Sequence, residues 1–321
     1  MKIIITGGAG FIGSNFANKF ADDHEIVALD NLFLGDESNL RNSKVKFVRG
    51  DAAEMADLKK CGEKFDAILH LAGTSSAPMF LGEKMQPAFR NSTESFLAVL
   101  EFAKMCGARK ILFASTSSLY GNWGARKLTE DLSPRPTNFY ATSKIFYEFA
   151  GENFQKLNPE IDIFGFRFMS VYGANEYPKG KFANVLSQFI WDFARGRSPV
   201  IFGDGEQTRD FTFVGDLIDA LFAAMKLEKK LGFQIFNVVT GKSVSLNSMT
   251  REIQKYFPNS APPKFIENPV RENYVLSQCA DISKIQKILK WAPRTDLAAG
   301  VKFQIENLEI GKIRETSSDG F

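Results

Sequence analysis

Short β-rich runs alternate with longer helix-like segments through the first half of the chain. The expected strands are residues 2–6, 25–30, 44–48, 67–71, 110–115 and 162–168. Between them, apolar residues recur three and four positions apart, as in Phe96, Val99, Leu100 and Ala103, which is typical of amphipathic helices. Strands that alternate with helices form βαβ units. The pattern therefore predicts an α/β fold with a doubly wound parallel sheet covered by helices on both faces.

The sequence changes character after Gly173, where loops become longer and prolines punctuate the chain. We expect residues 1–173 to form the sheet domain, with some later segments returning to it. Residues 174–310 are expected to form a smaller, mostly helical region, with a ligand cleft between the two parts. Residues 311–321 are expected to form a flexible tail, because they are largely polar.

The composition argues against several classes of protein. The net charge is only +3 and basic residues form no long run, so nucleic acid is not an expected partner. No apolar stretch reaches the length that a membrane span requires, so we expect no membrane association. Three cysteines and two histidines match neither a disulfide framework nor a metal motif. We therefore expect no metal, and a cytoplasmic protein with reduced thiols.

Three glycines, Gly7, Gly10 and Gly13, follow the first expected strand directly and open a helical pattern. Their G-x-x-G-x-x-G spacing is a variant of the dinucleotide-binding fingerprint. Glycine permits the tight turn and lets backbone amides approach a pyrophosphate, which the N-terminus of the helix attracts. The pattern predicts a Rossmann-type dinucleotide site that includes Phe11 and Ile12 at the start of the helix.

An acidic residue, Asp30, ends the second expected strand. A carboxylate at this position accepts hydrogen bonds from the adenosine ribose and repels a 2′-phosphate. No lysine or arginine follows until Arg41, so we expect the cofactor to be NAD rather than NADP. His70, at the end of the fourth strand, is interpreted as a structural residue rather than a base. Further NAD contacts are expected just after these strands, at Asn31, Asp51, Ala52, Leu71, Ala72 and Gly73.

A tyrosine and a lysine, Tyr140 and Lys144, are four residues apart, which places them on one face of a helix. A free tyrosine has a pKa of about 10 and is a poor base at neutral pH. A nearby ammonium group and the positive ring of NAD⁺ lower that pKa by favouring the phenolate. A cluster of hydroxyls at residues 115–118 ends the fifth strand in the same crevice. The combination predicts a catalytic site in which one hydroxyl contacts both the phenol and the substrate.

With these motifs the chain resembles the extended short-chain dehydrogenase/reductase family over nearly its whole length. The family includes NAD-dependent nucleotide-sugar epimerases and dehydratases, among them UDP-glucose 4-epimerase. The resemblance implies that Tyr140 is the base, that Lys144 assists it, and that Thr116 is the catalytic hydroxyl. It also implies that Asp51 contacts the adenine and that Asn91 lies near the cofactor.

The resemblance also suggests residues that bind the substrate. Arg209 and Arg271 resemble arginines that grip the nucleotide diphosphate, although surface salt bridges are an alternative role for both. Dehydratases of the family carry an Asp–Glu pair where this chain has Ser117 and Ser118, so dehydration is disfavoured and the serines are expected to face the substrate. Ser170 stands where the family often has an asparagine that contacts a substrate phosphate.

We therefore expect epimerisation of a nucleotide sugar through a transient keto-sugar intermediate, as in UDP-glucose 4-epimerase, with a UDP-hexose as substrate. The alternative is a reaction like that of ADP-glycero-manno-heptose 6-epimerase, with Lys179 as a second base rather than a solvated loop residue. Gln278, at a position that governs tolerance of N-acetyl sugars in 4-epimerases, does not decide between substrates. A non-catalytic NAD-binding sensor is disfavoured, because a sensor does not need a base.

Members of the family commonly dimerise through the helix that carries the Tyr–Lys pair. The resemblance therefore implies a homodimer. Phe146 and Phe149 on this helix are expected to contribute to the interface, with packing in the core as the alternative.

Overall fold

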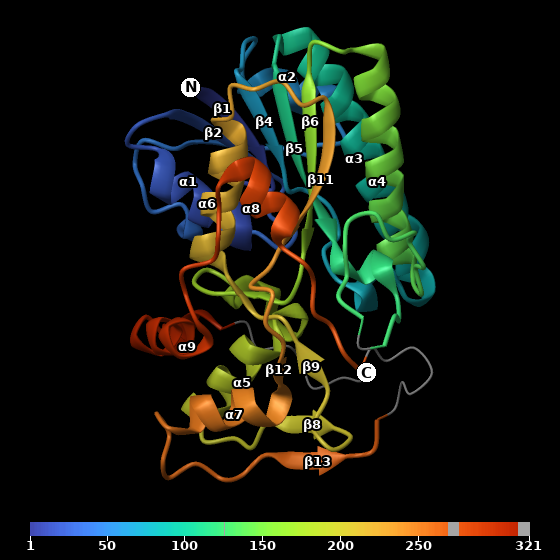
Figure 1. The fold of residues 1–321 in the computed structure, drawn as a ribbon. Helices are drawn as coiled ribbons and strands as arrows, with labels where there is room; N and C mark the ends of the chain where they lie inside the picture. Colours follow the sequence, from blue (N-terminus) through green and yellow to red (C-terminus); the bar gives the residue numbers. More distant parts are fainter. Residues whose placement is uncertain (125, 269–275, 314–321) are drawn as a thin grey trace.

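A seven-stranded sheet forms the centre of the molecule (Figure 1). The computed structural model describes residues 1–124, 126–268 and 276–313. The strand order is β11-β6-β5-β4-β1-β2-β3, and each neighbouring pair is parallel. The strands are β1 (Lys2–Thr6), β2 (Glu25–Asp30), β3 (Lys46–Arg49), β4 (Ala67–His70), β5 (Lys110–Thr116), β6 (Asp162–Phe168) and β11 (Phe233–Val238). The predicted doubly wound α/β fold is confirmed.

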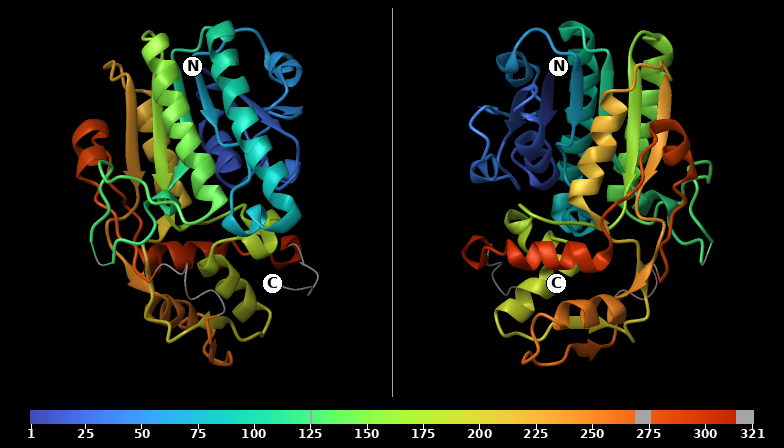
Figure 2. Two further views of the ribbon diagram at one scale, coloured as in Figure 1. Left: turned by 90° about the vertical axis from the view of Figure 1, so that its right-hand side faces the viewer. Right: turned by 60° about the vertical axis from the view of Figure 1, so that its left-hand side comes forward.

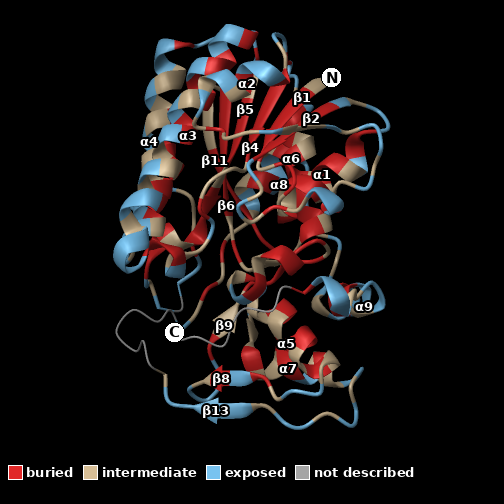
Figure 3. Ribbon diagram, turned by 180° about the vertical axis from the view of Figure 1, so that it is seen from behind, coloured by how far each residue is buried: buried red, intermediate tan, exposed pale blue. Residues whose placement is uncertain are grey.

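Helices cover both faces of the sheet because alternate strand residues point to opposite faces. Ile3 and Ile5 belong to one core cluster, with α1 (Phe11–Phe20), α6 (Val214–Met225) and α8 (Ser283–Leu289). Ile4 belongs to the other, with α2 (Met55–Cys61), α3 (Met85–Cys106) and α4 (Phe139–Leu157). Figure 3 shows that the strands between these layers are buried. The sheet edge at β11, together with α6 and α8, comes from the second half of the chain.

A second, smaller layer of structure lies beyond the carboxyl ends of the strands (Figures 1 and 2). It contains α5 (Val185–Ala194), α7 (Leu246–Gln254) and α9 (Leu297–Glu306), which share a separate apolar core. We call this part the C-terminal region. Short strand pairs complete it or connect it to the sheet domain: β8 (Val200–Phe202) with β13 (Lys264–Ile266), β9 (Thr208–Arg209) with β12 (Val244–Ser245), and β7 (Val171–Tyr172) with β10 (Thr212–Phe213).

The last described residues, 310–313, are structured. Ile310–Lys312 forms a short 3₁₀ turn and Ile313 is buried, so the beginning of the expected tail is structured. The rest of that segment, residues 314–321, lies outside the described residues. Within the described ranges, no helix has the length and apolar character needed to cross a membrane.

Candidate active site

One cavity of about 1170 Å³ lies at the carboxyl ends of the strands, where the sheet domain meets the C-terminal region. Parallel α/β sheets bind ligands at this edge. The cavity lining includes every residue that the sequence predicted to contact the cofactor: Gly7, Gly10, Phe11, Ile12, Gly13, Asp30, Asn31, Asp51, Ala52, Leu71, Ala72, Gly73, Asn91, Tyr140 and Lys144. The fold thus gathers segments that are far apart in the sequence around one space.

The turn between β1 and α1, the glycine loop, has no room for a side chain at Gly7 or Gly13. Gly7 has a φ of +71°, and a Cβ there would lie 2.8 Å from the backbone nitrogen of Ala72. A Cβ on Gly13 would overlap the carbonyl oxygen of Gly7. Gly10 caps the N-terminus of α1 and lines the cavity. The loop therefore exposes the N-terminal amides of a ten-residue helix to the cavity, a cradle that fits a pyrophosphate.

Asp30 connects the end of β2 to the same loop. Its carboxylate accepts hydrogen bonds from the backbone amides of Ala9, at 3.1 Å, and Leu32, at 2.8 Å. Burial raises the pKa of Asp30, and the backbone hydrogen bonds oppose that rise. Beside it, the Asn31 side chain donates to a carboxylate oxygen of Asp51 at 3.0 Å. Two acidic groups thus line the part of the cavity where the adenosine ribose and the adenine are expected.

His70 is built into the core behind this edge. Its Nδ1 atom is 2.8 Å from the Thr6 hydroxyl, and its Nε2 atom is 3.4 Å from the hydroxyl of Tyr147. The side chain is fully buried, which lowers the pKa of His70 well below its usual value. A neutral imidazole held between two hydroxyls has a structural role, in agreement with the interpretation of the sequence.

The predicted catalytic residues meet where β5 and α4 approach each other. Burial raises the pKa of the Tyr140 phenol, and a hydrogen bond with the Thr116 side chain acts in the opposite direction. The Thr116 hydroxyl also accepts a hydrogen bond from the backbone amide of Ser118, at 3.1 Å, which fixes the turn after β5. Lys144 lies one helical turn after Tyr140 and is only 4% exposed. Burial lowers the pKa of Lys144 to about 7.

Lys144 has aromatic rather than acidic surroundings. Its Nζ atom lies 4.0 Å from the centre of the Tyr147 ring, and among the described residues no carboxylate pairs with it. A buried ammonium group without a counter-ion is costly, so a negative charge beside it is stabilising. A phenolate at Tyr140 would provide that charge. The arrangement therefore suits a tyrosine that must lose its proton during a reaction.

A comparison with known proteins decides the family. The model of the NAD dependent epimerase/dehydratase family matches residues 3–238. The chain is similar to a putative UDP-glucose 4-epimerase of Methanocaldococcus jannaschii, with 32% identity over 94% of this chain and 96% of that protein. The chain belongs to the NAD-dependent epimerase/dehydratase family. The resemblance, the NAD cofactor and the epimerase-type enzyme that the sequence predicted are thereby confirmed.

Solved structures of epimerases share the whole architecture. A UDP-glucose 4-epimerase from Thermotoga maritima, solved with UDP-glucose, has a TM-score of 0.88 and 27% identity, covering 95% of this chain and 98% of that one. A UDP-glucuronic acid 4-epimerase from Bacillus cereus, solved with UDP-glucuronic acid and NAD, has a TM-score of 0.85 and 28% identity, with the same coverage. Epimerases with different sugars thus share this fold.

In this member of the family, three serines expected to face the substrate line the cavity: Ser117, Ser118 and Ser170. Ser170 has a φ of 41°, which lies in the left-handed region. Asparagine adopts this conformation more readily than serine, so the position is strained here and tolerates the asparagine that the family often carries. Gln278 also lines the cavity and is 9% exposed.

The three cationic residues predicted to bind the substrate differ in where the structure places them. Lys179 lines the cavity, and its Nζ atom pairs with Glu176 at 2.9 Å. Arg209 lies in β9, where its guanidinium donates to the carbonyl of Thr208 at 2.8 Å, and it is not among the described residues that line the cavity. Arg271 lies outside the described residues. Of the two that the structure describes, Lys179 lines the cavity and Arg209 does not.

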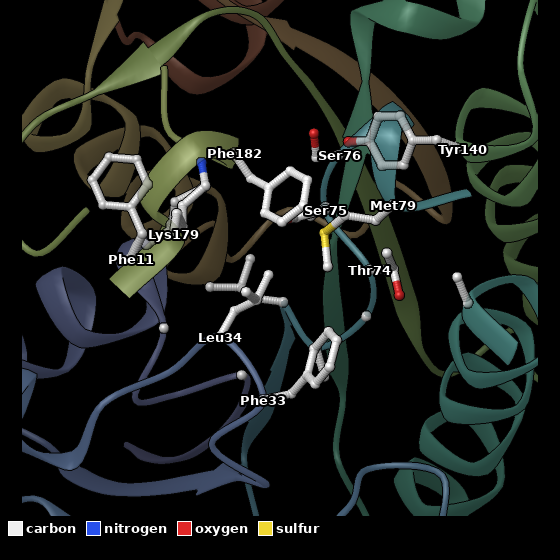
Figure 4. Close-up of a pocket in the computed structure, with 18 of the residues that line it drawn as sticks. Phe11, Phe33, Leu34, Thr74, Ser75, Ser76, Met79, Tyr140, Lys179 and Phe182 are labelled. Atoms are coloured by element: carbon white, nitrogen blue, oxygen red, sulfur yellow. The ribbon is translucent and has the colours of Figure 1, made fainter. Parts of the chain in front are cut away.

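The sequence analysis missed several residues that line the cavity. Figure 4 shows Leu34, Met79 and Phe182, from three separate segments, around the same space as Tyr140. Leu34 and Phe182 pack with Tyr140 against the cluster that contains Met79. Asn184 also lines the cavity and caps α5 through the amide of Leu186. These residues belong to loops without a motif, so only the fold brings them together.

The sequence analysis also missed a buried network behind the catalytic strand. The Ser115 hydroxyl, on β5, donates to the Glu148 carboxylate at 2.6 Å. Arg167, on β6, donates to both oxygens of Glu148, at 2.9 and 2.7 Å. Glu148 is one turn beyond Lys144 on α4. The network thus ties the helix that carries Tyr140 and Lys144 to two central strands.

Proposed function

We propose that this protein is a UDP-hexose 4-epimerase that interconverts UDP-glucose and UDP-galactose, with Tyr140 as the base. The observation that carries the proposal is the place of the Tyr140 phenol, which lies beside the Thr116 side chain, is one helical turn from the buried Lys144 amine, and shares a cavity with the glycine loop. Relatives that match this chain almost end to end are described as UDP-glucose 4-epimerases, which supports the same reaction.

Each catalytic side chain has a separate role in this reaction. Tyr140 takes the proton of the sugar hydroxyl and later returns it, while Thr116 holds the phenol and the hydroxyl in line. Lys144 stabilises the phenolate form of Tyr140. When bound, NAD supplies the hydride acceptor for the sugar carbon and the hydride donor for the return step. The glycine loop and Asp30 hold the cofactor, and the C-terminal region contributes the wall that faces the nucleotide sugar.

The geometry favours one base over two. A second base must reach the reacting carbon from the face opposite Tyr140. Lys179 lies beside Phe11, across the cavity from Tyr140 (Figure 4), so its pairing rather than its position argues against a second base. Lys179 also pairs with the buried carboxylate of Glu176, which suits a fixed positive charge better than a proton acceptor. These contacts support 4-epimerisation rather than the heptose 6-epimerase alternative.

NMR of the purified protein with catalytic NAD⁺ tests the proposal. We expect conversion of UDP-galactose to UDP-glucose. UDP-N-acetylglucosamine, UDP-glucuronic acid and ADP-D-glycero-D-manno-heptose form the comparison panel. Conversion of the heptose alone would assign the 6-epimerase reaction, and inertness toward UDP-galactose with turnover of another UDP sugar would move the proposal to that sugar. Inertness toward every sugar in a protein that retains NAD would favour a sensor.

We also propose that the protein forms a homodimer through α3 and α4. These helices pack together through the stacked rings of Phe96 and Tyr147, and their outer surfaces expose Leu97 (46%) and Phe149 (60%). Figure 2 shows the two helices side by side on one face of the molecule. Phe146 instead packs partly against the core. A second copy of this chain, as the family resemblance implies, would cover Phe149.

A further inference from the structure

The diphosphate of NAD carries two negative charges, which the amides at the N-terminus of α1 compensate only in part. The cavity lining of the described residues contains three cations: Lys84, Lys144 and Lys179. Lys144 belongs to the catalytic set and Lys84 is exposed. Lys179 is the remaining one, and its side chain is 18% exposed.

Lys179 lies directly beside the start of α1. Its Nζ atom is 5.4 Å from the centre of the Phe11 ring, and Phe11 is the first residue of that helix. Figure 4 shows the two side chains next to each other. The positive charge of Lys179 at this place adds to the positive potential of the helix N-terminus.

The ammonium group has a fixed position because its partner is fixed. The Glu176 side chain has no exposed surface, and its carboxylate accepts three hydrogen bonds. They come from Lys179 at 2.9 Å, from the backbone amide of Asn184 at 2.7 Å and from the hydroxyl of Ser187 at 2.5 Å. A buried carboxylate held in this way draws the lysine into the cavity wall and prevents it from moving freely in solvent.

The backbone that carries Lys179 is also attached to α1. The Asn15 side chain donates to the carbonyl of Ala174 at 2.8 Å, and the Asn175 side chain donates to the Ser14 hydroxyl at 3.1 Å. Both contacts join residues that are about 160 positions apart in the sequence. The lysine and the helix N-terminus are therefore held as one unit.

We propose that Lys179 binds the diphosphate of NAD and that Glu176 positions it for this role. The inference depends on the NAD cofactor and not on the sugar that the enzyme converts. It gives Lys179 a role in cofactor retention that differs from both roles weighed in the sequence analysis, a second base and a solvated loop residue.

The test measures the exchange of bound NAD for radiolabelled NAD in the holoenzyme, and the affinity for UDP by calorimetry. We expect Lys179→Met to accelerate the exchange by about tenfold or more, since a charge-assisted contact is lost. Lys179→Arg should restore slow exchange, and raised salt should accelerate exchange less in Lys179→Met than in the native protein. UDP affinity should stay within about twofold.

Lys181→Met is the matched control, because Lys181 is exposed on the same turn and is not among the described cavity-lining residues. It should leave the exchange unchanged. Glu176→Gln, which keeps the shape of the side chain, should give intermediate exchange. If Glu176→Gln fails to fold, Lys179→Met and Lys179→Arg still decide the point.

Unchanged NAD exchange in Lys179→Met would overturn the proposal. If UDP affinity fell while NAD exchange stayed unchanged, Lys179 would be assigned to the substrate diphosphate instead. A failure of the 4-epimerase proposal is recognised separately, because it shows in the native protein as absent turnover of UDP-galactose, whatever the rate of NAD exchange.

Discussion

Arg167 donates from two nitrogens to the two carboxylate oxygens of Glu148, and both side chains are buried, at 4% and 10% exposure. This pair joins β6 to α4 behind the strand that ends in Thr116. Bidentate pairs of this kind fix geometry as well as charge. The position of the catalytic tyrosine and lysine on α4 therefore depends on an ion pair that does not itself line the cavity.

We expect Glu148→Gln to lower the free energy of unfolding by about 3–5 kcal/mol, because a buried guanidinium loses its counter-charge. Urea unfolding followed by circular dichroism measures the change. Glu152→Gln on the same helix removes the partner of an exposed pair with Lys156 and should cost less than about 1 kcal/mol. Equal effects of the two substitutions would contradict the importance given to the buried pair.

Tyr140→Phe removes the proposed base and leaves the ring. Turnover should fall by about 10²–10⁴-fold, the usual contribution of a general base. Binding of NAD should persist, because the glycine loop and Asp30 are unchanged. Steady-state assays with UDP-galactose, together with the NAD content of the purified protein, check both parts. Tyr256→Phe, at a tyrosine that is 39% exposed, serves as the control and should keep full activity. Substantial turnover by Tyr140→Phe would exclude the phenol as base.

The buried Lys144 makes stability depend on pH. Its pKa is about 7 in the folded protein, against about 10.4 for an unfolded lysine. Between these values the unfolded chain binds more protons, so this residue makes the free energy of unfolding rise with pH. Without NAD, Lys144→Met should be more stable than the native protein below about pH 7, and the advantage should shrink towards about pH 10. An advantage that stays constant across this range would show that Lys144 is not the titrating group.

Gly13→Ala tests the close packing of the glycine loop. The added Cβ would meet the carbonyl of Gly7, so we expect a loss of about 1–3 kcal/mol in stability together with weaker NAD binding. Gly311→Ala is the comparison, since a Cβ at Gly311 has no neighbour within 4 Å among the described residues. Thermal unfolding with and without NAD separates the two effects. A Gly13→Ala protein with native stability and native NAD affinity would refute the packing argument.

Phe149→Glu tests the proposed homodimer. A charge on the exposed face of α4 should be harmless to a monomer but should disrupt an apolar interface between two copies. Light scattering coupled to size exclusion should show a dimer for the native chain and a monomer for the variant. Leu276→Glu, at another exposed apolar position (65%) that belongs to neither helix, should leave the mass unchanged. A monomeric native protein would contradict the proposed homodimer.

The sequence predicted what depends on local patterns. The bounds of β1, β2 and β6 agree with the expected strands, β4 and β5 differ by one residue at one end, and β3 is shifted by one or two residues at both ends. The glycine loop and the Tyr–Lys pair were also found, because turn geometry and helical spacing are encoded within a few neighbouring residues. These motifs sufficed to predict the fold class, the cofactor and the family.

Only the tertiary structure decided which distant residues meet. β11 completes the sheet from the second half of the chain, and Glu148 on α4 pairs with Arg167 on β6. Lys179 acquires the buried partner Glu176 and a place beside Phe11, whereas Arg209 lies away from the cavity lining. Such contacts depend on how whole elements pack, and a local pattern carries no information about an element that is 160 residues away. The catalytic motifs are therefore encoded in short local segments, whereas the ion pairs between distant residues are determined by how the helices and strands pack.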